Sequence, residues 1–183
     1  KIKNKKYNVR DFAFDEVWTS KQLNQKQFKR LNNFFWILSL DLKSSRSVVQ
    51  SIIYNWIKIN EKFNDKSWDF DTTSKRIISW LSNSRLTYSD CNDDYKIKFN
   101  YMIQKQALHL INHIENSKTY NDKLIGVAAI ILVGLSFKNE KVFTIKGLEI
   151  LKKITKNSLD NLGFPKSRSI KQLIFYLKYL ILI

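Results

Sequence analysis

Proline, glycine and cysteine are all scarce in this sequence, which contains one Pro, four Gly and one Cys in 183 residues. Folds that depend on many tight turns, such as β-sandwiches, need more turn-forming residues than this, whereas long uninterrupted helices do not. The single Cys91 excludes an internal disulfide. No membrane span is predicted, because the longest apolar run, residues 124–135, is too short to cross a bilayer.

Acidic residues are also few: there are 32 Lys and Arg against 16 Asp and Glu, for a net charge of +16. A surface with this excess attracts polyanions such as nucleic acids and anionic glycans. The lysines are spread through nearly every segment, which argues against a dedicated nucleic-acid-binding strip. Many of them are equally consistent with ordinary solvated helix faces. We therefore expect no specific nucleic-acid partner.

Apolar residues are plentiful, at 44% hydrophobic and 14% aromatic, so the chain can form a real core. They recur at helical spacing, as in the set that joins Val49, Ile53 and Trp56 on one face. Trp36, Trp56 and Trp80 are expected to be largely buried. The sequence predicts an all-α fold of helical hairpins over residues 22–41, 46–63, 72–84, 94–116, 121–137, 140–157 and 168–183. Residues 1–20 are expected to be an extended N-terminal segment, and residues 21–183 one helical domain.

The most informative segment is residues 67–81, SWDFDTTSKRIISWL, which has Trp68 before a predicted helix. Arg76 and Trp80 lie four residues apart on that helix, so their side chains are neighbours on one surface. A guanidinium beside an indole suits a ring-shaped anionic ligand. The same spacing equally suits a buried Trp that is covered by an Arg. The expected N-caps of this helix are Asp71, Thr72 and Thr73.

Three more segments accompany this one along the chain: residues 31–40 (LNNFFWILSL), 51–57 (SIIYNWI) and 160–168 (DNLGFPKSR). Together the four segments resemble the helical domain of heparinase II/III-like polysaccharide lyases over roughly residues 18–183. This resemblance implies a partial (α/α) toroid that binds an acidic polysaccharide in its groove. It also implies a C-terminal β-sandwich domain in the same protein, no cofactor, and a bacterial, periplasmic location.

In that family the reaction is β-elimination, in which a sugar carboxylate is neutralised, a base removes the C5 proton and an acid assists the leaving oxygen. The helical pattern stops at Ile183 without a stop signal, so we expect a fragment that is truncated at its C-terminal end and catalytically incomplete. The alternative is a non-enzymatic helical scaffold or polyanion-binding module.

By this resemblance, Asn121 matches an Asn that faces the substrate at a helix start, although Asp122 stands where the family has His or Arg. The other interpretation of Asn121 is a helix N-cap. Lys166 and Arg168 precede the last helix and could bind an anion there, while Ser167 or Ser169 could cap that helix. The family's His and Tyr that follow the glycine turn have no counterpart in this segment.

Gln106, His109 and His113 share one face of the predicted 94–116 helix. The two histidines have the spacing of a zinc-ligand pair, but no further ligands cluster with them, so we predict no metal site. They form either a polar row that faces the groove or ordinary hydrogen-bonded helix residues. If the toroid forms, Arg76 and Asn121 should converge with Lys166 and both histidines on its concave face. The expected substrate-binding residues are thus Trp68, Arg76, Trp80, Gln106, Lys166 and Arg168, and the catalytic candidates are Asn121, His109 and His113.

Overall fold

The structure is a computed structural model, and it describes residue 18 and residues 23–40, 45–137 and 140–183. Within these ranges the chain is helical, and its only β-type pairing is an isolated bridge between Leu159 and Pro165. The prediction of an all-α fold is confirmed. The extended segment predicted for residues 1–20 lies outside the described residues, apart from Trp18, which is buried.

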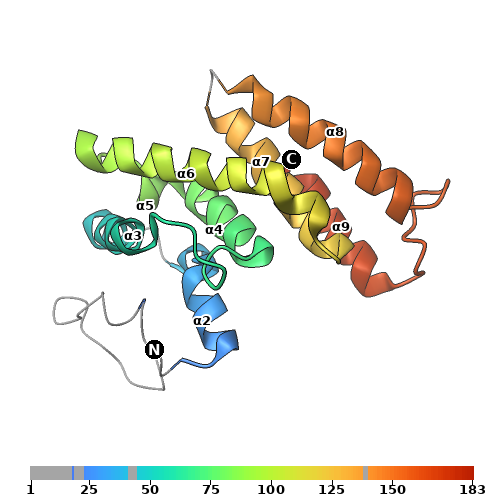
Figure 1. The fold of residues 1–183 in the computed structure, drawn as a ribbon, viewed down its shortest axis with the longest axis horizontal. Coiled ribbons are helices and arrows are strands. Elements are labelled where there is room, and N and C mark those ends of the chain that lie inside the picture. Colours follow the sequence, from blue (N-terminus) through green and yellow to red (C-terminus); the bar gives the residue numbers. More distant parts are fainter. Residues whose placement is uncertain (1–17, 19–22, 41–44, 138–139) are drawn as a thin grey trace.

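The helices follow one another with short connections (Figure 1). The first half of the chain contains α2 (Gln25–Asn32), the 3-10 helix η2 (Phe35–Ser39), α3 (Arg46–Asn60), α4 (Phe70–Ser82) and the short α5 (Ser84–Thr87). The second half contains α6 (Asp93–His113), the 3-10 helix η3 (Ile114–Asn116), α7 (Tyr120–Ser136), α8 (Lys141–Ser158) and α9 (Ile170–Leu182).

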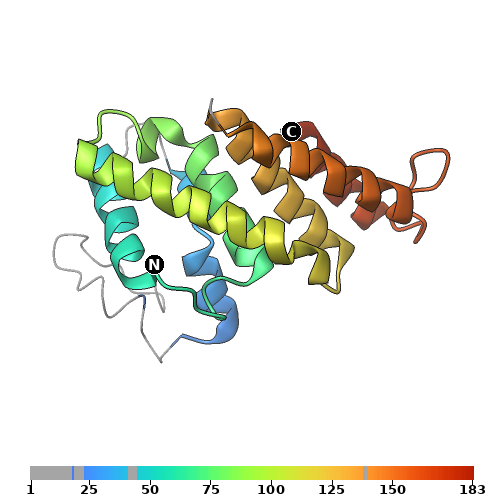
Figure 2. The same ribbon diagram turned by 45° about the horizontal axis from the view of Figure 1, so that its top comes forward.

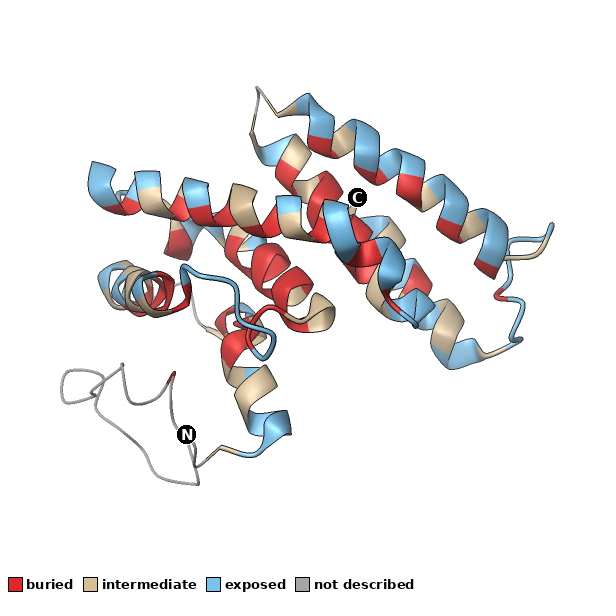
Figure 3. Ribbon diagram, viewed as in Figure 1, coloured by how far each residue is buried: buried red, intermediate tan, exposed pale blue. Residues whose placement is uncertain are grey.

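Helix α7 is the central element of the core, because it contacts α4, α6, α8 and α9. Its side chains are buried almost all round from Leu124 to Val133. Figure 3 shows this continuous burial, and Figures 1 and 2 show α8 running antiparallel to α7 along its side. An apolar helix of this length is therefore explained by burial inside the domain. Among the described residues, no helix has the length and hydropathy that crossing a membrane would require.

The contact between α7 and α8 is close because glycine lies on both helices. A Cβ atom at Gly134 of α7 would lie 2.5 Å from the backbone nitrogen of Thr144 on α8. A Cβ atom at Gly147 of α8 would lie 2.5 Å from Cγ1 of Ile131 on α7. These two of the four glycines are thus explained by helix packing instead of by turns.

The helix predicted for residues 22–41 is wrong as a single element, since it is divided into α2 and η2. Phe34 separates the two with a left-handed backbone, at φ 57°. Its fully buried ring lies 5.4 Å from the ring of Trp18 and 5.2 Å from that of Trp80, measured between centroids. Its carbonyl accepts a hydrogen bond of 2.7 Å from Ser79 Oγ on α4. Contacts that are distant in sequence thus stabilise a conformation that costs about 1–2 kcal/mol locally.

Two further boundaries differ from the prediction. Helix α4 begins at Phe70, two residues earlier than expected, and its N-cap is Asp69, whose carboxylate accepts from the backbone N–H of Thr72 at 3.3 Å. The expected caps Asp71, Thr72 and Thr73 therefore lie inside the first turn. The connection between the helices predicted for residues 72–84 and 94–116 contains the short helix α5. The assembly of these helices into a partial toroid stays a prediction.

Candidate functional site

Four of the six predicted substrate-binding residues lie in the interior of the domain. Arg76, Trp80 and Gln106 are fully buried, and Trp68 is 2% exposed. Arg76 and Trp80 come from α4, Gln106 comes from α6, and Trp68 lies in the connection before α4. In this structure these side chains offer almost no surface to a ligand.

The guanidinium of Arg76 forms hydrogen bonds in several directions at once. Nε donates to Gln106 Oε1 at 2.7 Å, and Nη1 donates to the carbonyls of Asn32 at 2.9 Å and Ser67 at 3.0 Å. Nη2 donates to Thr73 Oγ1 at 3.3 Å. Burial lowers the pKa of Arg76 to about 9, although the charge of Asp69 opposes this shift. The group thus remains a cation at neutral pH and connects α2, α4, α6 and the 61–69 connection.

The indole beside this guanidinium is that of Trp56 on α3. The Arg76 Cζ atom lies 4.0 Å from the centroid of the Trp56 ring. The Trp80 ring instead packs edge-on against Trp56 at 5.6 Å and stacks with Phe99 at 5.4 Å. The interpretation of the motif as a buried aromatic core covered by an arginine therefore agrees with the geometry.

His109 lies half-buried in a group of aromatic rings at the C-terminal half of α6. Its ring centroid is 5.1 Å from Phe63, 5.6 Å from Trp68 and 6.1 Å from Phe70. His113 follows one turn later, exposed, with its ring 5.1 Å from that of His109. The structure therefore brings three predicted site residues, Trp68, His109 and His113, into one cluster.

Burial lowers the pKa of His109 below its ordinary value, and the charges of His113 and Arg76 lower it further. A hydrogen bond to the backbone of Trp68 opposes this shift. The imidazole is thus neutral at pH 7, the form that can accept a proton. The described residues contain no group of three or more His, Cys, Asp or Glu side chains that could hold a metal ion.

Asn121 is exposed on the first turn of α7 and does not cap the helix. The cap is Thr119, whose Oγ1 accepts from the backbone N–H of Asp122 at 3.1 Å. The prediction of Asn121 as an N-cap is wrong, because the helix begins one residue earlier, at Tyr120. The side chain of Asn121 is consequently available to a ligand, and its proposed role in catalysis stays a prediction.

Lys166 and Arg168 are exposed in the connection between α8 and α9. The carboxylate of Asp160 organises this turn by accepting from the backbone N–H of Phe164 at 2.9 Å and pairing with Arg168 Nη1 at 2.8 Å. Ser169 caps α9 through the backbone N–H of Gln172 at 3.3 Å, as predicted. Because Arg168 already has an acidic partner, Lys166 is the freer cation of the two. The structure does not bring either residue into contact with Arg76, which lies in the core.

A basic and aromatic surface that the sequence reasoning missed runs along α3 and α6. We define the α3–α6 surface as Tyr54, Lys58, Lys98, Tyr101 and Lys105. Nζ of Lys58 lies 4.6 Å and Nζ of Lys98 4.7 Å from the centroid of the Tyr54 ring. Nζ of Lys105 lies 5.4 Å from the centroid of the half-exposed Tyr101 ring and donates to the carbonyl of Glu61 at 2.8 Å.

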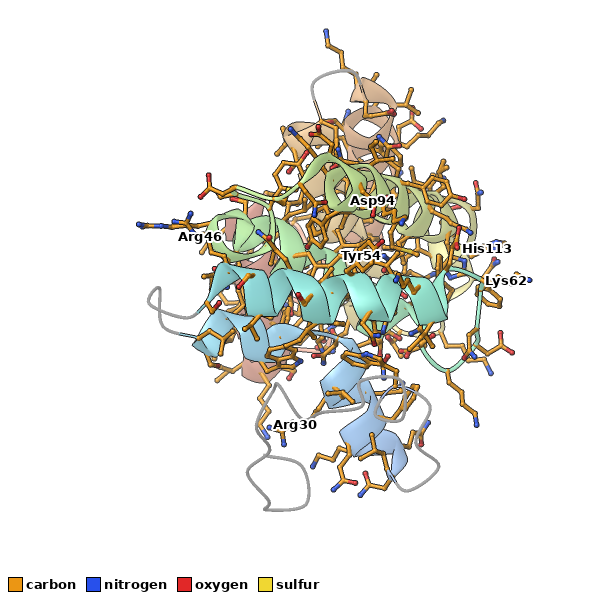
Figure 4. The ribbon with its side chains drawn as sticks, turned by 90° about the vertical axis from the view of Figure 1, so that its left-hand side faces the viewer. Arg30, Arg46, Tyr54, Lys62, Asp94 and His113 are labelled. Atoms are coloured by element: carbon orange, nitrogen blue, oxygen red, sulfur yellow. The ribbon has the colours of Figure 1, made fainter. Side chains whose placement is uncertain are left out.

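One carboxylate, Asp94, orders the middle of this surface. The Tyr54 hydroxyl donates to Asp94 Oδ2 at 2.7 Å, and Lys98 Nζ donates to the same oxygen at 3.0 Å. The hydrogen bond from Tyr54 and then that from Lys98 hold the pKa of Asp94 below its ordinary value. Figure 4 shows Tyr54 and Asp94 side by side above α3, with Arg46 toward one end of the helix and Lys62 and His113 toward the other.

A signal for this surface was present in the sequence. Tyr54 and Lys58 have i, i+4 spacing on α3, while Lys98, Tyr101 and Lys105 follow at i, i+3 and i+7 on α6. What the sequence lacked was the pairing of α3 with α6, which places the two rows together.

Comparison with known proteins yields no match to this chain among protein-family models, curated proteins or solved structures.

Proposed function

We propose that this chain binds an acidic polysaccharide, as the helical part of a heparinase II/III-like lyase, and that the α3–α6 surface holds the polymer. The support for the polymer class comes from the chemistry of that surface, where ammonium groups flank the partly buried Tyr54 ring and the half-exposed Tyr101 ring. Ammonium groups attract carboxylates and sulfates, and aromatic rings offer apolar faces against which a sugar ring can pack. The support for the lyase family is the order of the four sequence segments.

The observation that carries the proposal is the position of Lys58. Its ammonium lies over the Tyr54 ring on the exposed side of α3, and in the described part of the chain it forms no ion pair. Lys98, on the other helix, flanks the same ring but is partly neutralised by Asp94. A bound sugar carboxylate could pair with Lys58 without breaking a direct ion pair, although the charge of Lys58 also acts on Asp94.

The proposed domain binds and does not cleave. Elimination needs a carboxylate-neutralising group, a base and an acid that meet at one sugar. The neutral His109 is half-enclosed by rings, whereas the exposed Asn121 belongs to another helix. We propose that the full reaction needs the additional β-sandwich domain that the resemblance implies.

A non-enzymatic helical module that binds polyanions is the second candidate, and one observation favours it. The motif that most resembles the lyases, with Trp68, Arg76 and Trp80, forms part of the core in this structure. Its resemblance therefore supports a shared fold more directly than a shared reaction.

The test is binding of heparin and alginate oligosaccharides by the charge-loss variant Lys58→Gln/Lys105→Gln. Its matched control is Lys152→Gln/Lys156→Gln, which removes the same charge from the exposed face of α8. We expect the first pair to weaken binding about tenfold and the control to change it little, because two direct ion contacts are lost only in the first. Binding should also weaken as salt rises.

Circular dichroism on each variant establishes that it is folded. The proposal would be contradicted if both double variants lost the same oligosaccharide affinity, or if the chain bound duplex DNA as tightly as the oligosaccharides. Either result would mean that binding depends only on diffuse charge attraction. Formation of an unsaturated sugar product by this chain alone would contradict the non-catalytic part of it.

A further inference from the structure

Helix α9 has two faces of different character. Its inner face carries Tyr176 and Tyr179, each 2% exposed, and packs against α7. Its outer face carries four aliphatic side chains that project from the domain. Their exposed fractions are 73% for Ile170, 62% for Ile174, 47% for Leu177 and 82% for Ile181.

The spacing of these four residues is specific. Ile170, Ile174, Leu177 and Ile181 follow one another at intervals of 4, 3 and 4, which is the d-a-d-a pattern of a coiled coil. With 3.6 residues per turn, the four exposed side chains fall within a sector of about 60°. A helix that lies in a membrane interface needs a broad apolar face, whereas a narrow stripe of this kind suits the seam with one other helix.

The charges beside the seam indicate the chemistry of that helix. In this register Lys171 and Lys178 are both at e positions, and both are exposed. Helix α9 contains no acidic residue. From Lys141 to Ile183 the chain has nine Lys and Arg residues against Glu149 and Asp160 as its only acids.

A second copy of α9 would fit this seam poorly. Antiparallel pairing would place e positions opposite e positions, so Lys171 and Lys178 would face lysines. Parallel pairing would place Lys178 opposite Leu173, the g residue of the preceding heptad in the other copy. Neither arrangement gives the ammonium groups an acidic partner.

We propose that the outer face of α9 is a docking site for an amphipathic partner helix with an apolar a/d stripe and glutamate or aspartate at its flanking positions. The partner's aliphatic side chains pack against the stripe formed by Ile170, Ile174, Leu177 and Ile181. Its carboxylates pair with Lys171 and Lys178. This site is independent of the α3–α6 surface and of the proposed polysaccharide binding.

The experiment uses two synthetic helical peptides on the order of four heptads long, with Leu and Ile at a and d. One carries Glu and the other Lys at every e and g position. Fluorescence anisotropy should show that the Glu peptide binds the intact chain at least about tenfold more tightly than the Lys peptide, since like charges oppose association. The variant Lys171→Glu/Lys178→Glu should reverse this preference.

Ile174→Asp and Ile181→Asp should abolish binding, because a carboxylate cannot enter an apolar seam. Ile97→Asp is the matched control, since Ile97 is 68% exposed on α6. All of these positions are exposed, so circular dichroism is expected to show folded variants.

Several outcomes would overturn the proposal: equal binding of both peptides, binding of neither, or binding that survives Ile174→Asp. Dimerisation that Ile174→Asp abolishes, seen by analytical ultracentrifugation, would assign the seam to a second copy. Binding to phosphatidylglycerol vesicles through the same residues, with neither peptide bound, would assign it to a lipid surface.

Discussion

Arg76 shows how one buried side chain can determine the arrangement of several segments. A guanidinium is costly to remove from water unless its N–H groups have acceptors. Here it has acceptors on Asn32, Ser67 and Gln106, and its face is covered by the Trp56 ring. The Trp56 Nε1–H in turn donates to Asn32 Oδ1 at 2.8 Å. Each of these groups provides a hydrogen-bond partner for another. The loss of one therefore leaves buried donors or acceptors without a partner.

We therefore predict that Arg76→Leu destabilises the domain by at least about 3 kcal/mol, because two buried carbonyls and a buried amide oxygen lose their donor. Urea denaturation followed by circular dichroism measures this change. Lys75→Leu, one residue away, loses the partly exposed pair with Asp71 and the position of its ammonium 5.9 Å from the centroid of the Phe35 ring, and it should cost less than about 1 kcal/mol. Any loss of polysaccharide binding in the Arg76 variant should follow the loss of folded protein. An Arg76→Leu protein that is as stable as the parent would contradict this account.

The sequence identified these residues as important but left their role open. The four-residue spacing of Arg76 and Trp80 fits both a ligand site and a covered core. The structure resolves the packing in favour of the core and replaces Trp80 with Trp56 as the stacking partner. That partner lies twenty positions away on another helix, so no local pattern could select it. Trp56 and Trp80 are buried as predicted, whereas Trp36 is only half-buried on η2.

At the scale of helices, the spacing of apolar residues predicted which helices form more accurately than it predicted where they begin and end. Six of the seven predicted helices occur as α-helices near their predicted ranges. The exception, residues 22–41, is interrupted at Phe34 because buried aromatic rings and Ser79 stabilise a left-handed residue. Such stabilisation comes from the tertiary structure and leaves no periodic signal in the sequence.

Because α7 packs closely against α8, we predict a stability change for Gly134→Ala that is opposite in sign to the change that helix propensity predicts. Gly→Ala inside a helix usually stabilises by about 1 kcal/mol. At Gly134 the added methyl would lie 2.5 Å from Thr144 N, so α8 would have to move. We expect Gly134→Ala to destabilise by about 1–3 kcal/mol.

Thermal and urea unfolding measure this change. Ser136→Ala is the control, because Ser136 is exposed on the last turn of the same helix. Its effect should stay within about 0.5 kcal/mol. A stabilised Gly134→Ala protein would mean that α7 and α8 lie further apart than described.

At the scale of the whole molecule, the sequence predicted the charge but not where it acts. The net charge of +16 indicated a polyanion partner, and the lysines appeared evenly spread. Only the packing of α3 against α6 gathers Lys58, Lys98 and Lys105 with two tyrosines. Arg76 was predicted to converge with Asn121 and Lys166 on one face. In the structure Arg76 faces the interior, whereas Asn121 and Lys166 are exposed.

The position of α7 predicts that the domain unfolds as one cooperative unit. The chain's five tryptophans all lie between residues 18 and 80, so their fluorescence reports only the first half. Far-ultraviolet circular dichroism reports every helix, including α7, α8 and α9. Because α7 packs against α4 as well as against α8, neither half can lose its structure without exposing the core of the other. We expect the two probes to give coincident urea transitions.

The decisive variant is Ile154→Ala, which removes a buried side chain of α8, a helix without tryptophan. If the domain is one unit, the free energy of unfolding should fall by the same amount with both probes. We expect a loss of about 2–4 kcal/mol, since a core Ile is truncated. Ile97→Ala, an exposed change on α6, should shift neither. A shift that appears in circular dichroism but leaves the tryptophan curve in place would show that the later helices unfold separately. In that case α7 would not join the two halves energetically, despite its contacts with both.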